Sequence, residues 1–214
     1  MVWSIGRNDK WYKHGRLSPH FNGKLRGYAG LTNTAKQIAE YIPKCKLYVE
    51  PFAGLGRVAK NIKSDKMVLN DISPYAINYL EKHFDAEVTN EDFEVCIRRW
   101  DSIDTFFLID PPWSKSTYEK DFEDNVDRKG EKYVMVSNLT PTQYYQKLLE
   151  ILPTMKGNWI LCSNHSRKIK HPFHEKIVIS PKKLMGFNIK TKLISNLPFE
   201  IRGPHTKKLT EMFN

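Results

Sequence analysis

The stretch Tyr48-Val-Glu-Pro-Phe-Ala-Gly-Leu-Gly56, with the acid Asp71 downstream, decides the fold predicted for this chain of 214 residues. Lys46–Glu50 and Met67–Asn70 are short runs typical of buried strands, and two glycines lie in the turn after the first run. In a doubly wound sheet, such a turn lets a ligand reach the backbone and a helix N-terminus. An acidic residue at the end of the next strand can accept hydrogen bonds from both hydroxyls of a ribose. Together they predict a nucleoside-cofactor site.

The rest of the chain alternates strand patterns with helix patterns. Helices are predicted after Thr34, from Gly56 to about Ile62, after Pro74, after Asp92 and after Pro141. Further strands are predicted at 106–109, 159–162, 176–180 and 187–194. This alternation favours one α/β domain with a mostly parallel sheet and helices on both faces.

Composition excludes several classes of protein. Hydrophobic residues make up 40% of the chain, enough for a core, and no apolar run approaches the roughly 20 residues of a membrane span. The N-terminus lacks the basic-then-apolar layout of a signal peptide. Cys45, Cys96 and Cys162 form no Cys-x-x-Cys pair, and the histidines after Cys162 fit no zinc pattern. We therefore expect a soluble cytoplasmic protein without a metal site.

Charge is segregated along the chain. Lys and Arg number 34 against 24 Asp and Glu, for a net charge of +10. Residues 1–30 hold six bases and one acid, and residues 165–214 hold eleven bases and three acids, whereas acids prevail between them. A solvated surface is one explanation. A segregated basic excess with interleaved aromatic residues is also the pattern of a polyanion site, and it predicts a nucleic-acid partner.

Two kinds of ligand are compatible with the glycine turn. Gly54-Leu-Gly-Arg-Val-Ala59 satisfies a loose dinucleotide fingerprint, which a nicotinamide-dependent oxidoreductase would use. However, Asp71 comes early for that fingerprint, and Glu50 puts a carboxylate just before the turn. A carboxylate suits a cationic ligand better than a pyrophosphate. S-adenosylmethionine, which carries a sulfonium and an amino group and no phosphate, therefore fits this turn better.

A second motif, Asp110-Pro111-Pro112-Trp113, follows the apolar strand 106–109. Its position predicts that it lies at the carboxyl end of the sheet, where ligands bind in open α/β folds. Two prolines remove both backbone donors, and an ionised Asp only accepts, so this corner offers acceptors to an –NH₂ group. The tryptophan supplies a face on which a planar ring can stack. A simple break after the strand is the alternative reading.

In combination, these blocks resemble the S-adenosylmethionine-dependent DNA adenine-N6 methyltransferases, the family of the bacterial deoxyadenosine methylases. The resemblance covers about residues 28–164 and implies a Rossmann-like methyltransferase fold with an antiparallel C-terminal strand. It implies catalytic roles for Asp110, Pro111, Pro112 and Trp113. It implies cofactor contacts by Tyr28, Ala29, Gly30, Glu50, Pro51, Phe52, Ala53, Gly54, Gly56, Asp71, Ile72, Asp92, Phe93 and Asp110.

The chain departs from the family pattern in two places. Leu31-Thr32 stands where relatives have Gly-Lys, so the N-terminal cofactor motif is incomplete. Only 17 residues separate Asp92 from Asp110, which leaves no room for the target-recognition insertion of many relatives. Within a methyltransferase domain of residues 28–214, target recognition is therefore expected from loop 114–140 or the basic region 165–214. The basic aromatic arm 1–27 is the third candidate.

The resemblance implies methyl transfer from S-adenosylmethionine to the N6 amino group of adenine in DNA, with the base stacked on Trp113. Trp at that position also occurs in RNA adenine methyltransferases, so an RNA substrate is the first alternative. A catalytically silent nucleic-acid-binding subunit is the second. A glutamine-N5 protein methyltransferase is disfavoured because those relatives have Asn-Pro-Pro-Tyr, whereas this chain has Asp110. The sequence does not indicate an oligomeric state.

Overall fold

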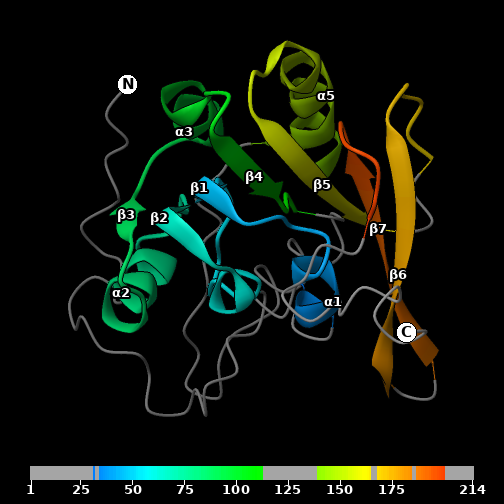
Figure 1. Ribbon diagram of the computed structural model, residues 1–214, viewed down its shortest axis with the longest axis horizontal. Coiled ribbons are helices and arrows are strands. Elements are labelled where there is room, and N and C mark those ends of the chain that lie inside the picture. Colours follow the sequence, from blue (N-terminus) through cyan, green and yellow to red (C-terminus); the bar gives the residue numbers. More distant parts are fainter. Residues whose placement is uncertain (1–30, 32–33, 113–138, 165–167, 185–186, 201–214) are drawn as a thin grey trace, which may run out of the picture.

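The computed structural model describes residues 31, 34–112, 139–164, 168–184 and 187–200. Its centre is a seven-stranded sheet in the order β3-β2-β1-β4-β5-β7-β6 (Figure 1). The strands are β1 Cys45–Glu50, β2 Ser64–Asn70, β3 Glu87–Thr89, β4 Thr105–Ile109, β5 Asn158–Asn164, β6 His174–Leu184 and β7 Phe187–Ser195. Neighbouring strands pair in parallel, except that β7 is antiparallel to both β5 and β6. The predicted Rossmann-like sheet with an antiparallel C-terminal strand is confirmed.

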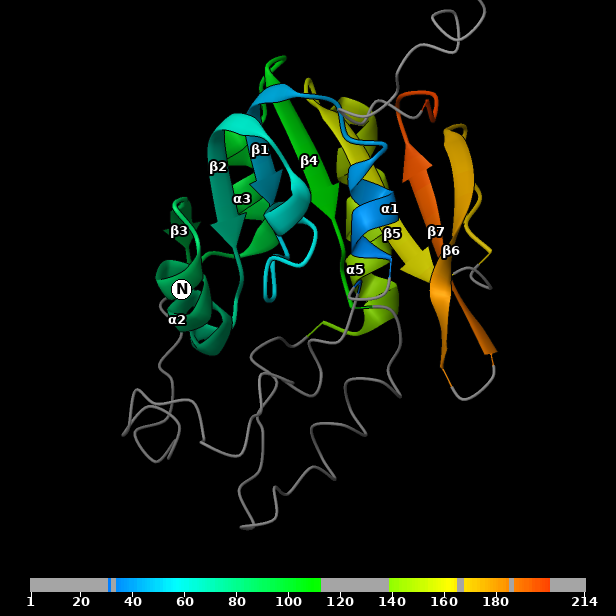
Figure 2. The same cartoon turned by 60° about the horizontal axis from the view of Figure 1, so that its bottom comes forward.

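Helices cover both faces of the sheet (Figures 1 and 2). They are α1 Ala35–Ala39, α2 Pro74–His83, α3 Phe93–Trp100 and α5 Pro141–Ile151, with 3-10 turns at η2 Ala59–Asn61 and η3 Leu152–Thr154. Successive strand residues point to opposite faces, so Tyr48 joins the core under α1 and α2 while Val49 joins the core under α3 and α5. None of the helices in the described ranges has the length and apolar character that a membrane crossing requires.

Side-chain caps fix where two of the helices begin. The Asp92 carboxylate accepts a hydrogen bond from the Glu94 backbone N–H at 2.8 Å and so starts α3. Thr140 and Gln143 form a reciprocal capping box at the start of α5. Asp92 lies three residues after the end of β3, at the carboxyl edge of the sheet. The predicted starts after Asp92 and at Pro141 are confirmed.

The predicted helix from Gly56 to about Ile62 is wrong. Only the three residues of η2 are helical there, after a series of turns. Gly54 and Gly56 have φ angles of 53° and 59°, in the left-handed region that an α-helix cannot include. Most of the segment after β1 is therefore turn, which backbone hydrogen bonds such as that from the Ala53 N–H to the Asn70 carbonyl hold at the sheet edge.

Candidate cofactor and active site

The glycine turn is tied to the end of β2. The Ala53 N–H donates to the carbonyl of Asn70 at 2.8 Å, and the Gly56 N–H donates to the carbonyl of Ala53 at 2.7 Å. Gly56 leaves room for a ring, because a Cβ built on it would lie 2.3 Å from Cζ of Phe84. The turn thus combines left-handed backbone at Gly54 and Gly56 with close approach of a neighbouring side chain.

Asp71 lies beside this turn, as the sequence predicted. The Gly54 N–H donates to its Oδ2 at 2.8 Å, and the Ser73 N–H donates to its Oδ1 at 2.9 Å. Burial raises the pKa of Asp71 to about 6, although these two hydrogen bonds act in the opposite direction. Each carboxylate oxygen keeps a further acceptor site, so the geometry fits a ligand with two adjacent hydroxyl groups.

Glu50 is a buried carboxyl group at the end of β1, only 4% exposed. The Tyr48 hydroxyl donates to its Oε1 at 2.6 Å. The pKa of Glu50 is raised from 4.5 to about 8, because burial and the negative charge of Asp110 outweigh the hydrogen bonds from Tyr48 and from the Ala59 N–H, which lower it. Two carboxyl groups, one after β1 and one after β4, therefore act on each other at the sheet edge. Such a pair fits a cationic ligand.

The corner after β4 is described as far as Pro112. Asp110 follows the last strand residue and is half-buried, Pro111 is buried and Pro112 is half-buried. The two prolines have no N–H, so the corner presents carbonyl and carboxylate acceptors. Trp113 lies outside the described residues. The same holds for Tyr28, Ala29 and Gly30, for the arm 1–27 and for most of the loop 114–140.

Asp92 and Phe93 occupy different environments. Asp92 is exposed and caps α3, whereas Phe93 is 3% exposed within the core. The Phe93 ring stacks on Phe52 with centroids 5.1 Å apart and contacts Tyr144 of α5 at 5.4 Å. Phe52 and Phe93 thus join the glycine turn to α3 and α5. Their cofactor contact remains a prediction.

Other predicted cofactor residues line the same turn or the end of β2. Pro51 and Ala53 are buried, and Ile72 is half-buried beside Asp71. Asn90, from the segment after β3, donates through Nδ2 to the carbonyls of Asp71 at 2.8 Å and Ile72 at 3.0 Å. The structure therefore brings the predicted residues after β1, β2 and β3 to one edge of the sheet.

Asn70 also lies at this edge, where the sequence predicted only the end of a strand. Its side chain is fully buried. Its Nδ2 donates to the carbonyls of Pro51 and Glu91, both at 3.0 Å, and its Oδ1 accepts from the Glu91 N–H and the Thr89 hydroxyl, both at 2.9 Å. The sequence feature that could have indicated this role is a polar residue at the end of an apolar strand, directly before Asp71.

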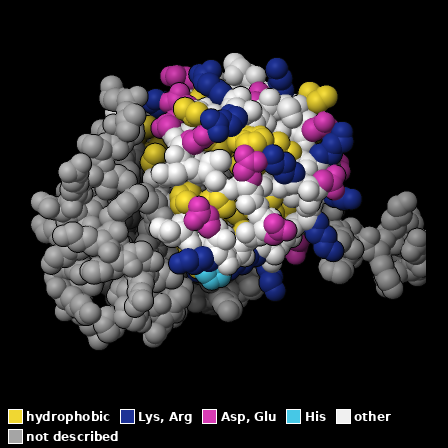
Figure 3. All heavy atoms as spheres, turned by 90° about the vertical axis from the view of Figure 1, so that its left-hand side faces the viewer, with side chains coloured by type: hydrophobic (Ala, Val, Ile, Leu, Met, Phe, Trp, Pro, Cys, Tyr) yellow, Lys and Arg dark blue, Asp and Glu magenta, His cyan; other side chains and the backbone are white. Residues whose placement is uncertain are grey.

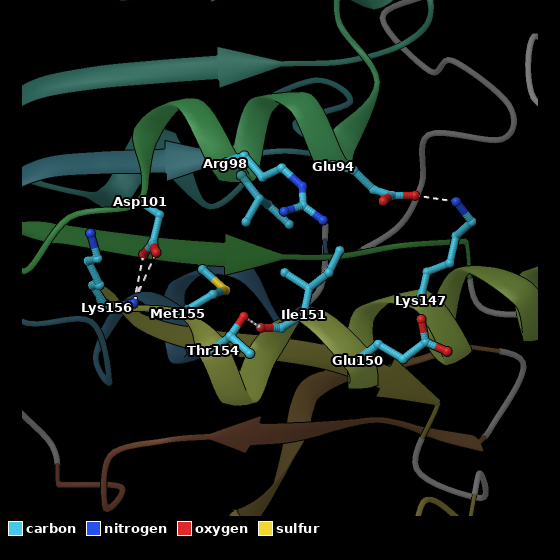
Figure 4. Close-up of a pocket in the computed structure, with 10 residues that line it drawn as sticks. Glu94, Arg98, Asp101, Lys147, Glu150, Ile151, Thr154, Met155 and Lys156 are labelled. Carbon is cyan, nitrogen blue, oxygen red and sulfur yellow. Dashed lines mark hydrogen bonds and ion pairs between the residues drawn. The ribbon is translucent and has the colours of Figure 1, made fainter.

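A cleft of about 660 Å³ runs between α3 and α5 (Figure 4). It is lined by Glu94, Ile97, Arg98, Asp101, Lys147, Glu150, Ile151, Thr154, Met155 and Lys156. Lys147 and Glu94 form an ion pair across it, and the Asp101 carboxylate accepts from the Lys156 and Gly157 N–H groups. None of the predicted site residues lines this cleft, although its Glu94 donates through the backbone N–H to Asp92.

The surface around β3, α2 and α3 carries mixed charge (Figure 3). Lys and Arg side chains alternate there with Asp and Glu, and Lys66 pairs with Glu87 at 2.7 Å. This face belongs to the middle of the chain, where acids prevail in the sequence. Among the described residues, no three His, Cys, Asp or Glu side chains are grouped so that they could hold a metal ion.

Comparison with known proteins matches part of the chain to a family. Residues 30–84 match the model of the D12 class N6 adenine-specific DNA methyltransferases. This segment contains β1, the glycine turn, β2 and α2. A search of curated proteins found no match.

Similar solved structures include three from streptococci. A conserved hypothetical protein from Streptococcus pyogenes is 12% identical, with a TM-score of 0.48 over 82% of this chain and 98% of its own. An rRNA methylase from Streptococcus thermophilus is 9% identical, with a TM-score of 0.45 over 76% and 92%. A candidate methyltransferase from Streptococcus mutans in complex with SAH is 8% identical, with a TM-score of 0.45 over 76% and 95%.

Replacing Gly56 by Ala is expected to destabilise the protein by about 1–3 kcal/mol. The methyl group would overlap the Phe84 ring, and the residue would keep a left-handed φ of 59°. Urea unfolding of wild type and variant measures the difference. Gly157→Ala does not serve as a neutral control, because its Cβ would lie 2.9 Å from a backbone oxygen. Unchanged stability of Gly56→Ala would contradict the turn geometry.

Glu50→Gln is expected to flatten the pH dependence of stability. A carboxyl pKa raised from 4.5 to about 8 means that the folded state holds a proton that the unfolded state has released, so stability falls as the pH rises through that window. The amide keeps an acceptor for Tyr48 without this titration. Free energies of unfolding at pH 5.5 and 8.5 measure the slope. An equal fall in both proteins would show that Glu50 is not the source.

Proposed function

We propose that this methyltransferase, whose residues 30–84 match the D12 class and whose cofactor is S-adenosylmethionine, methylates the N6 amino group of adenine in DNA. One observation carries the proposal. Asp110 and Pro111, which follow β4, lie at the same sheet edge as Glu50, the glycine turn and Asp71, and the negative charge of Asp110 contributes to the raised pKa of Glu50. An amino group and a cationic cofactor are the partners that these groups suit.

The cofactor would be held by residues from three strand ends. Gly54 and Gly56 let it approach the backbone, and Asp71 would accept from its ribose hydroxyls. Glu50 would face its cationic groups, and Asp92 would lie toward its adenine. When bound, the cofactor supplies a methyl group on a positively charged sulfur. The buried carboxyl at Glu50 supports this assignment, since burial without a cationic partner is unfavourable for its charged form.

The target base would be activated by hydrogen bonding. The adenine amino nitrogen is a poor nucleophile because its lone pair is delocalised into the ring. Acceptors at Asp110 and the Pro111 carbonyl would favour a pyramidal nitrogen and free the lone pair for a new N–C bond. The bond between the methyl carbon and the sulfur would break as it forms, and the nitrogen would then lose one proton. The Trp113 side chain would stack on the base, taken out of the duplex or from a single strand. Most of the rate enhancement would then come from positioning.

Recognition of the polyanion would fall to the basic parts of the chain. In the candidate region 165–214, the side chains of Lys168, Lys170 and Lys176 are exposed. Such exposed cations would contact phosphates, which provide most of the sequence-independent affinity for nucleic acid, although the Lys176 ammonium also lies over the Tyr41 ring, 6.0 Å from its centroid. The arm 1–27 and the loop 114–140 remain the other candidates.

Asp110→Ala is expected to lower methyl transfer by more than about 100-fold, the typical cost of losing a group that acts at the reacting atom. Tritiated-methyl transfer from S-adenosylmethionine to unmethylated duplex DNA, single-stranded DNA and structured RNA measures it. Asp104→Ala is the matched control, because Asp104 precedes the other end of β4 and only pairs with Lys46 on the surface.

Each outcome of this experiment has a distinct meaning. Label recovered as N6-methyladenine in DNA, absent from Asp110→Ala and present in Asp104→Ala, supports the proposal. Label only in RNA transfers the same site to an RNA substrate. Cofactor binding without label on any nucleic acid would instead support a silent subunit. More than a few per cent of wild-type activity in Asp110→Ala would remove the role of the carboxylate.

Cofactor binding is expected to release protons at neutral pH. Glu50, with a pKa raised to about 8, is largely protonated at pH 7 in the free protein, and a cationic ligand beside it would favour its ionised form. Titration calorimetry in phosphate and in Tris buffer measures the released protons through the different ionisation heats of the buffers. Equal binding heats in both buffers, or the same release by Glu50→Gln, would contradict a cation beside Glu50.

A further inference from the structure

We propose that Asn70 is the positioning residue of the cofactor site, because its side-chain amide fixes the glycine turn relative to the segment that carries Asp92. The inference rests on the proposed cofactor site. Asn70 does not touch the cofactor in this proposal. It acts through the backbone of Pro51 on one side and of Glu91 on the other.

The chemistry of this position requires an amide. Two carbonyl oxygens, of Pro51 and Glu91, face the nitrogen of the Asn70 side chain, and two donors, the Glu91 N–H and the Thr89 hydroxyl, face its oxygen. Only an amide offers two donors and two acceptor sites without a charge. A carboxylate would lose both donors, and a Gln amide would sit one methylene farther from the strand. All four bonds also assign the orientation of the amide.

The backbone next to this side chain binds the same two segments. The carbonyl of Asn70 accepts from the Ala53 N–H at 2.8 Å, and the Asp71 N–H donates to the carbonyl of Thr89 at 3.3 Å. The side chain of Asp71 then holds the Gly54 N–H. Asn70, the last residue of β2, and Asp71, the residue after it, therefore connect the turn after β1 with the segment after β3.

The short length of β3 makes this connection necessary. β3 has three residues, which pair with Val68, Leu69 and Asn70, and the ladder ends at Thr89. Glu91 lies beyond that ladder, and the Asn70 side chain binds both its N–H and its carbonyl. The position of Asp92, one residue later, is therefore set by Asn70 together with the cap of α3. A change at Asn70 would alter the spacing between the two sides of the cofactor.

The test compares Asn70→Asp with Asn196→Asp. Asn196 is a matched control, because its side-chain amide also makes two hydrogen bonds to the backbone. Its oxygen accepts from the Trp159 N–H at 3.0 Å, and its nitrogen donates to the Gly157 carbonyl at 3.3 Å. Those partners lie at the start of β5, the opposite edge of the sheet from the glycine turn. The dissociation constant of S-adenosylhomocysteine is measured by calorimetry, with thermal unfolding as a check on folding.

We expect Asn70→Asp to weaken the binding of S-adenosylhomocysteine by about tenfold or more, because two hydrogen bonds are lost. The dissociation constant of Asn196→Asp is expected to stay within about twofold of the wild-type value. Lowering the pH from 8 to 5.5 should narrow the gap between Asn70→Asp and wild type, because a protonated carboxyl regains one donor. The acidic groups nearest to position 70 are Glu50 at the end of β1, Asp71 as the next residue, and Glu91, and all three are present in both proteins. The ratio of the two constants therefore isolates position 70.

Thr89→Val provides a milder second variant if Asn70→Asp does not fold. It removes only the hydroxyl that donates to the Asn70 oxygen and is expected to weaken binding about threefold. Wild-type affinity in Asn70→Asp or Thr89→Val, or equal losses in Asn70→Asp and Asn196→Asp, would overturn the inference alone. Failure of the wild-type protein to bind would overturn the proposed cofactor site and, with it, this inference.

Discussion

The hydrogen bonds made by Asn70, the last residue of β2, and by Asp71, the residue after it, are the constraint on which the proposed site depends. Parallel strands all end at the same edge of a sheet, and the loops that follow them are not held by hydrogen bonds between strands. In this protein, Asn70 and Asp71 supply the missing bonds to the turn after β1 and to the segment after β3. Because both side chains are buried, these bonds are shielded from water, and the loss of either partner would leave an unpaired polar group.

The buried carboxyl groups at the same edge lower the stability of the fold and suit the binding of a ligand. Burial raises the pKa of Glu50 to about 8 and that of Asp71 to about 6, so ionising either carboxyl at neutral pH costs folding free energy. A core built only for stability would place apolar side chains at these positions. Carboxyl groups with shifted pKa values concentrate at functional sites, where a bound partner supplies the compensating interactions. Glu50 and Asp71, the buried carboxyls with raised pKa values, thus lie at the proposed cofactor site and do not line the cleft between α3 and α5.

The sequence predicted the features that depend on local chemistry. Apolar runs located the main strands, Asp92 and Pro141 marked helix starts, and the acid after β2 lies at the glycine turn as expected. The helix after Gly56 was wrong, because the left-handed conformation of two glycines is decided by the fit of Phe84 and by bonds to β2. The role of Asn70 was missed for a related reason. The four groups that bond to its side chain belong to two segments about 20 residues away in the sequence. Neither periodicity nor motif spacing indicates such a long-range contact.

The two ligands of the proposed reaction carry opposite charges and need different binding surfaces. The cofactor is cationic at its reacting end, and the groups at the sheet edge are carboxyls from the acidic middle of the chain. Nucleic acid is a polyanion, and this edge would repel its phosphates. An extruded base is uncharged and can enter alone, whereas its backbone needs contacts elsewhere. A basic excess confined to the two ends of the chain meets that need. The segregated charge of the sequence and the buried carboxyls of the fold therefore have one common explanation.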